Sequence, residues 1–120
     1  MKYLIIIALL TGCADKIHAV NKRVNSYQYT PDKVSYMKTP EEFIKDGGGD
    51  CEDFANMKYQ ALLAEGFTGM KFVLPVKGEQ HAMLEVDGLI LDNMNDKLNR
   101  ASSVKGYRVN YETMQLIARK

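Results

Sequence analysis

The sequence predicts an α+β fold in which N-terminal helices pack on a small antiparallel β-sheet. Patterns typical of helices occupy the first half of the chain, up to Gly66. Patterns typical of strands follow, and the Asp-Gly pair at positions 87 and 88 is typical of a two-residue hairpin turn. The chain has 120 residues, 46% of them hydrophobic and 26% charged, which suffices for one domain with a modest core and excludes disorder.

The charge balance argues against two kinds of partner. Lys and Arg together number 16 and Asp and Glu 15, so the net charge is +1. Binding to a nucleic-acid backbone needs a basic excess, so no nucleic-acid partner is expected. The sequence has no run of about 18 apolar residues, and no membrane-spanning helix is predicted.

The first twelve residues are interpreted as a secretory signal rather than as part of the fold. Lys2 precedes a short apolar stretch, Leu4–Leu10, which small residues and Cys13 follow. The sequence Leu-Thr-Gly-Cys resembles the lipobox of bacterial lipoproteins. That resemblance implies removal of residues 1–12, lipid on Cys13 and, because Ala14 follows, delivery to the outer membrane on its periplasmic side. The alternative is a buried first strand that ends in a cysteine.

Three helical segments are expected before Gly66. Residues 15–25 place Ile17, Val20, Arg23 and Val24 on or near one side of a first helix. A loop is expected at 27–35, and Thr39-Pro40-Glu41-Glu42 then carries a complete capping box for a short helix that stops at Gly47. Asp50 can cap the third helix, whose apolar stripe occupies positions 51, 54, 55, 59 and 62.

The strands are expected in the second half. Met70–Val76 contains Pro75, which suggests an edge strand. His81–Val86 and Leu89–Asp92 form the predicted hairpin, and residues 95–106 are expected to be a polar loop. Tyr107–Tyr111 alternates like a strand, and Met114–Ala118 either continues it or makes a last helical turn.

Cys51 is the candidate nucleophile. If lipid occupies Cys13, Cys51 has no cysteine left to pair with. A lone thiol in an oxidising compartment risks unwanted pairing, so it is usually kept only where it packs in the core or reacts. The plain alternative is a small buried hydrophobe. However, Cys51 is the first residue of its predicted helix, where the helix dipole stabilises a thiolate, and three glycines before it are expected to leave the sulfur accessible.

A cysteine nucleophile needs a histidine base that a third group orients. His18 lies in the first predicted helix, whereas His81 opens the hairpin. With a two-residue turn, Asp92 falls on the same face as His81, at a diagonal position about 7–8 Å away. Alone, His81 is an ordinary strand-end histidine and Asp92 a turn former; together with Cys51 they predict a catalytic triad.

These segments resemble one family, the bacterial transglutaminase-like cysteine peptidases. The resemblance runs from about residue 17 to about residue 112 and is carried by Thr39–Ile44, Gly47–Ala55, His81–Leu84 and Leu91–Asn93, with Val20–Asn25 upstream. It implies a papain-like α+β fold and places the triad on Cys51, His81 and Asp92. Met37 departs from the family pattern, which usually has Trp there.

The resemblance also implies a biological role. The best-understood relatives are periplasmic proteases that clip the N-terminal region of large surface adhesins. They depend on calcium held by acidic residues beside the nucleophile, and the matching positions are Asp50 and Asp53, with Glu52 as a third. Helix capping by Asp50 and Asp53 is the alternative that needs no metal.

The sequence therefore predicts a monomeric, lipid-anchored periplasmic cysteine endopeptidase with the domain at 13–120. Its substrate would be a cell-envelope protein. A transglutaminase or amidase would use the same triad. A non-catalytic envelope binding or exclusion module would keep the fold without needing Cys51.

Overall fold

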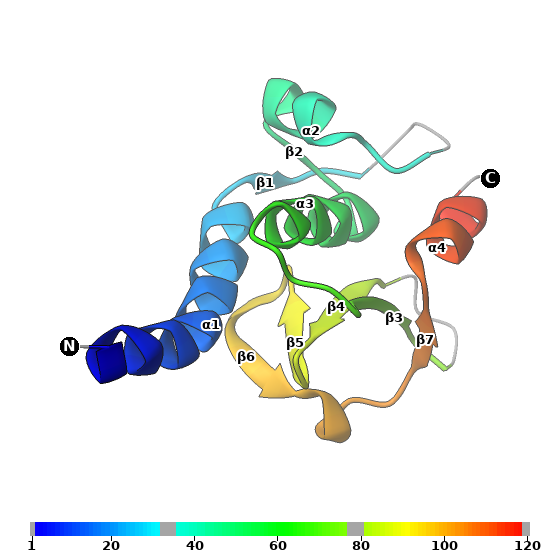
Figure 1. Cartoon of the computed structure of the whole chain (residues 1–120). Helices are drawn as coiled ribbons and strands as arrows, with labels where there is room; N and C mark the ends of the chain where they lie inside the picture. The colour runs from blue at the N-terminus through cyan, green and yellow to red at the C-terminus, as the bar shows by residue number, and fades with distance from the viewer. Residues whose placement is uncertain (1, 32–35, 77–80, 119–120) are drawn as a thin grey trace.

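The structure is a computed structural model that describes residues 2–31, 36–76 and 81–118, with side chains from residue 12 onward. Four α-helices and two sheets make up the described part (Figure 1). The elements are α1 (Lys2–Asn25), β1 (Gln28–Tyr29), α2 (Pro40–Asp46), β2 (Gly48–Gly49), α3 (Cys51–Ala64), β3 (Lys71–Leu74), β4 (Met83–Val86), β5 (Leu89–Asp92), β6 (Asn95–Arg100), β7 (Tyr107–Val109) and α4 (Tyr111–Ala118), with a 3-10 turn at Ala101–Ser103.

The large sheet is antiparallel and has the strand order β6-β5-β4-β3-β7. Figure 1 shows α3 over this sheet with α1 to one side of it. The predicted α+β architecture is thus confirmed. The core lies between these layers, and its fully buried members include Ile17, Phe43, Phe54, Leu62, Phe72, Leu84, Leu91 and Met114.

Helix α1 begins earlier than the sequence predicts. The expected first helix is 15–25, but helical hydrogen bonding extends upstream to Lys2, because the preceding leucines and alanine are good helix formers. Ile17, Val20 and Val24 are buried as expected, whereas Arg23 is exposed. Within the chain that the structure describes, no helix combines the length and apolarity needed to cross a membrane.

The two helix starts around the candidate nucleophile are confirmed. Thr39 and Glu42 form the predicted capping box of α2, which ends at Gly47 in the left-handed conformation. Asp50 caps α3 in a second reciprocal box with Asp53. Cys51 is therefore the first residue of its helix, as predicted.

The hairpin is confirmed at the predicted register, with Val86 opposite Leu89, Glu85 opposite Ile90 and Leu84 opposite Leu91. Asp87 and Gly88 both have positive φ, as a type I′ turn requires. Because this turn has two residues, side chains of β4 and β5 keep the facing parity that the sequence predicts.

One prediction about a strand and two predictions about loops are wrong. The strand before Pro75 is not at an edge: β3 lies between β4 and β7, and Pro75 follows its last residue, so no ladder hydrogen bond is lost. The expected polar loop at 95–106 contains β6, an edge strand whose polar side chains suit its exposure. The expected loop at 27–35 contains β1, which pairs in parallel with β2; residues 32–35 of that prediction lie outside the described residues. Of the two alternatives for Met114–Ala118, the helical one is correct, because this segment belongs to α4.

Candidate active site

The approach to Cys51 is built from two short strands. β1 pairs with β2 so that Gln28 lies opposite Gly48 and Tyr29 opposite Gly49. A Cβ atom on Gly48 would collide with the carbonyl oxygen of Gln28, and one on Gly49 would collide with the Asp53 carboxylate. These glycines are required because two other groups approach the backbone closely.

Cys51 is less accessible than the sequence suggests. Its exposed fraction is 8%, which places it in the core cluster as well as at the start of α3. The prediction of an accessible sulfur is therefore wrong, and the His81 ring, which hydrogen-bonds the Cys51 side chain, lies against it. Because Cys51 is buried, solvent screens the electrostatic interactions of its side chain with neighbouring charged groups only weakly.

His81 lies between Cys51 and Asp92. Its Nε2 atom is 2.8 Å from Oδ1 of Asp92, and its ring also hydrogen-bonds the Cys51 side chain. The hydrogen bond with Asp92, followed by the one with Cys51, raises the pKa of His81 to about 10, against the opposing effect of burial. His81 is therefore an imidazolium at neutral pH. His18, by contrast, is exposed on α1.

Asp92 is the last residue of β5, and its carboxylate is only 20% exposed. Burial acts to raise the pKa of Asp92, but hydrogen bonds from His81 and the Met94 backbone N–H, with the charges of His81 and Lys58, outweigh it and lower the value. Asp92 is thus ionised at neutral pH. The diagonal contact between Asp92 and His81 that the register predicts is present.

The three acidic residues around Cys51 differ in what they do. Asp53 is 1% exposed, and its two carboxylate oxygens accept backbone N–H groups of Lys38 (2.8 Å) and Asp50 (3.1 Å). Asp50 and Glu52 are half-buried, and both charges contribute to a raised pKa of Tyr29, after burial and Cys51. Among residues 12–31, 36–76 and 81–118, no three His, Cys, Asp or Glu side chains form a metal-binding group.

Comparison with known proteins then places the chain. The family model described as bacterial transglutaminase-like cysteine proteinase BTLCP matches residues 6–116. The chain belongs to that family. A comparison with curated proteins found no match.

Solved structures of Legionella pneumophila LapG share this proteinase fold. The EGTA-treated form is 31% identical with a TM-score of 0.72 over 82% of this chain and 64% of LapG. The calcium-bound form is 33% identical with a TM-score of 0.67, over 83% and 66%. A third LapG structure is 32% identical with a TM-score of 0.68, over 82% and 65%. The chain thus spans less than two thirds of these relatives, and the predicted transglutaminase-like fold is confirmed.

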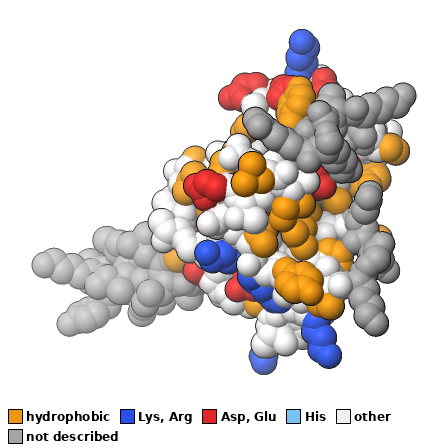
Figure 2. All heavy atoms as spheres, turned by 90° about the vertical axis from the view of Figure 1, so that its right-hand side faces the viewer, with side chains coloured by type: hydrophobic (Ala, Val, Ile, Leu, Met, Phe, Trp, Pro, Cys, Tyr) orange, Lys and Arg blue, Asp and Glu red, His pale blue; other side chains and the backbone are white. Residues whose placement is uncertain are grey.

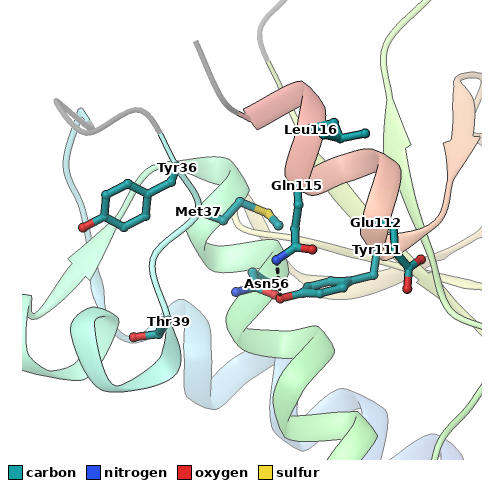
Figure 3. Close-up of a pocket in the computed structure, with 8 residues that line it drawn as sticks. All are labelled: Tyr36, Met37, Thr39, Asn56, Tyr111, Glu112, Gln115 and Leu116. Carbon is teal, nitrogen blue, oxygen red and sulfur yellow. Dashed lines mark hydrogen bonds between the residues drawn. The ribbon is translucent and has the colours of Figure 1, made fainter.

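The BTLCP fold also contains a pocket of about 550 Å³ apart from Cys51, His81 and Asp92 (Figure 3). Three parts of the chain surround this pocket: the segment that precedes α2, helix α3 and helix α4. None of Cys51, His81 and Asp92 lines it. Met37, at the position where the family usually has Trp, is 9% exposed and lines this pocket. Figure 2 shows apolar side chains gathered on one face of the molecule; the exposed apolar residues of α4 are Leu116 and Ile117.

Two residues near Cys51, His81 and Asp92 are not among those that the sequence patterns predict for the site. Tyr29 stands on β1, an element too short to produce an alternating pattern. Lys58 is 1% exposed, and the charges of Asp92 and Asp96 act on it. Its position could have been found, because residue 58 follows Cys51 by two helical turns and falls on the same buried stripe.

Proposed function

We propose that this chain is a cysteine endopeptidase that hydrolyses peptide bonds of a cell-envelope protein with Cys51, His81 and Asp92. The observation that carries the proposal is the position of His81, hydrogen-bonded to Asp92 at 2.8 Å and to Cys51. Cysteine nucleophile, histidine and orienting carboxylate stand in the order that acyl transfer requires.

The proposed reaction follows from these contacts. The Cys51 sulfur, as thiolate, attacks the scissile carbonyl carbon, and His81 then gives its proton to the leaving amine. Water, deprotonated by His81, attacks the resulting thioester and releases the acid with the Cys51 thiolate beside a protonated imidazole. Nε2 of His81 is committed to Asp92, which leaves Nδ1 for the sulfur and the leaving group.

The test compares thiol reactivity with proteolysis. In protein produced in the cytoplasm without residues 1–12, so that Cys13 keeps its thiol, iodoacetamide at pH 6.5 should alkylate Cys51 faster than the exposed Cys13, as measured by mass spectrometry of peptides. His81→Ala should slow the alkylation of Cys51 at least tenfold and leave that of Cys13 unchanged. Equal alkylation rates of Cys51 in wild type and His81→Ala would contradict the peptidase proposal and favour a non-catalytic binding module with the same fold.

The same preparation identifies the reaction. Envelope proteins incubated with the wild-type protein should gain new N-termini that Cys51→Ala does not produce, and Cys13→Ala is the matched thiol control. Products joined to an added primary amine, in place of new free carboxylates, would assign a transglutaminase instead. As substrate we propose the N-terminal region of a surface adhesin, following the family resemblance; a Cys51→Ala strain should then retain adhesin at its surface.

Calcium is proposed as the ion of this site. LapG has been solved in calcium-bound and EGTA-treated forms. In this chain Asp50 and Glu52 fit a hard cation, since they flank Cys51, keep solvent exposure and act together on Tyr29. Asp53 fits poorly as a ligand because its oxygens hold the backbone of Lys38 and Asp50. Backbone carbonyls and water would supply the remaining ligands, and a bound cation there would order the loop before Cys51.

The location is proposed from the N-terminal sequence. Residues 1–12 are taken as a signal that is removed, and Cys13 as the lipidated first residue of a domain at 13–120 on the periplasmic side of the outer membrane. Cys13 is exposed on α1, which suits a modified side chain.

A further inference from the structure

Two asparagine side chains lie on the face of α1 that packs on the sheet. Asn21 and Asn25 are four residues apart, so they stand one above the other on the helix. Asn21 is 0% exposed and Asn25 is half-buried, although the same side of α1 buries Val20 and Val24. A buried amide is unfavourable unless it is hydrogen-bonded, so the partners of these two side chains explain why polar residues stand there.

The partners belong to the turn that joins β5 to β6. Asn21 Nδ2 donates to the carbonyl oxygens of Asn95 and Asp96, both at 3.1 Å. Asn25 Nδ2 donates to the carbonyl oxygen of Asp92 at 2.9 Å and to that of Asn95 at 3.3 Å. It also donates to Oδ1 of Asp96 at 3.1 Å. The end of α1 therefore holds this turn from Asp92 to Asp96.

Asp92 lies where the regular pairing of the sheet ends. The register between β4 and β5 runs as far as the pair Leu84 and Leu91, one residue before Asp92. The register between β5 and β6 is irregular between Ile90 and Asp92. The pairing of β4 with β5 therefore fixes Asp92 less firmly than the residues before it, and the hydrogen bond from Asn25 supports the Asp92 backbone at this point.

The same turn also orients the carboxylate. Asp92 Oδ1 accepts the backbone N–H of Met94 at 3.1 Å and lies 2.8 Å from Nε2 of His81. Met94 belongs to the turn that the two asparagines hold. Loss of Asn25 would let the Asp92 carbonyl and the Met94 N–H shift, and the carboxylate would then move relative to the imidazole.

We propose that Asn25 is a positioning residue which, with Asn21, holds the turn after β5 so that the Asp92 carboxylate faces His81. Asn25 does not touch the reacting atoms and acts through Asp92. Its effect on turnover rests on the proposed peptidase function, whereas its effect on the hydrogen bond between Asp92 and His81 does not.

The experiment measures that hydrogen bond by NMR in the folded protein. The chain has two histidines, so the Nε2–H signal of His81 is identified in ¹⁵N-histidine-labelled protein by its loss in His81→Gln. In Asn25→Ala this proton signal should move upfield, because its hydrogen bond to Asp92 becomes longer. Asn110→Ala is the control: it removes the acceptor of the Thr113 N–H at the start of α4 and should leave the His81 signal unchanged.

Stability and positioning should rank the two asparagines in opposite order. Asn21 is the more deeply buried, so Asn21→Ala should lower Tm more than Asn25→Ala does. Asn25 contacts Asp92 itself, so Asn25→Ala should move the His81 signal further and lower kcat about tenfold while KM stays constant. A merely structural role would give the same order in all three measurements.

A second variant keeps the proposal testable if Asn25→Ala does not fold. Asn25→Asp has the same shape but turns a carboxylate toward the carbonyl oxygens of the turn, so it should move the His81 signal at least as far. A signal that stays unchanged in the folded Asn25 variant, or that moves equally in Asn110→Ala, overturns the proposal. A signal that moves as expected, in a protein whose wild type shows no proteolysis, overturns only the peptidase.

Discussion

At the scale of single residues, the ionisable groups of the candidate site determine one another's protonation states. His81 is held protonated by Asp92 and Cys51, and Asp92 is held ionised by His81, the Met94 N–H and Lys58. Each of these groups would titrate differently on its own. Replacing one of them is therefore expected to change its neighbours' protonation more than their positions.

Asp92→Asn is the first prediction at this scale. The amide keeps the size of the side chain but no longer fixes the tautomer of His81 or stabilises its cation, so kcat should fall by about three to four orders of magnitude. Thermal unfolding followed by circular dichroism should show that the fold persists. Asp87→Asn makes the same chemical change at the hairpin turn, where Asn also tolerates the positive φ of 49°, and should retain full turnover. Full activity in Asp92→Asn would remove Asp92 from the proposed triad.

At the scale of elements, the contact between β1 and β2 determines where α3 begins. Gln28 N–H donates to the carbonyl of Gly47 and Thr30 N–H to that of Gly49, so β1 fixes the loop just before Cys51. The Asp50 and Asp53 capping box then starts the helix. The position of the sulfur thus depends on two strands of two residues each.

Gly48→Ala tests this contact. Gly48 has a φ of 148° and its added Cβ would meet the Gln28 backbone, so the free energy of unfolding should fall by about 2–4 kcal/mol. Gly69→Ala is the control, because Gly69 has a φ of 71° but open space around it, and should cost only about 1 kcal/mol. Urea unfolding of both variants measures the difference. Equal losses of unfolding free energy in the two variants would mean that β1 shifts to accommodate the added Cβ atom at no energetic cost.

The same elements show what sequence can and cannot predict. The hairpin and both capping boxes depend on neighbouring residues, so Asp87-Gly88, Thr39-Glu42 and Asp50-Asp53 were sufficient. β1 and β6 were missed because one has two residues and the other is a polar edge strand without an apolar alternation. The proximity of His81 to Asp92 followed from strand parity, whereas the burial of Cys51 and the approach of Lys58 depend on how α3 packs on the sheet.

At the scale of the whole molecule, two groups give opposite dependences of stability on pH. The pKa of His81 is raised from 6.5 to about 10, so its stabilising effect is complete below pH 6.5 and is lost as the pH rises through 10. The pKa of Lys58 is lowered from 10.5 to about 7, so the unfavourable burial of its charge is complete below pH 7 and fades as the pH rises toward 10.5.

Thermal unfolding at pH 6, 8 and 10 separates these effects. The Tm of wild type minus that of His81→Gln should decrease steadily across this range. The Tm of wild type minus that of Lys58→Met should increase across it. Differences that stay constant with pH would show that neither group changes its proton affinity on folding.

Calcium should stabilise the whole domain if Asp50 and Glu52 bind it. A ligand that binds only the native state raises Tm by mass action, so chelation should lower Tm and added calcium, in preference to magnesium, should restore it. Asp50→Asn with Glu52→Gln should abolish this response, and Glu41→Gln, an exposed carboxylate on α2, should keep it. A Tm indifferent to chelator in the wild type would leave Asp50 as a helix cap alone.

The anchor is tested in cells. Cys13→Ser should leave an uncleaved precursor that no longer incorporates radioactive palmitate or sediments with membranes. Cys51→Ser retains the proposed lipidation site and should be labelled like wild type. Labelling that persists in Cys13→Ser would contradict the lipoprotein proposal.

The separation of Cys51 from its partners along the chain has a consequence for timing. Cys51 begins α3, whereas His81 and Asp92 belong to a hairpin that follows β3, and only the packing of α3 on the sheet joins them. A nascent or translocating chain therefore has no imidazole beside its thiol. Under the proposed function the protein is chemically latent until it folds, and it needs no separate inhibitory segment during export.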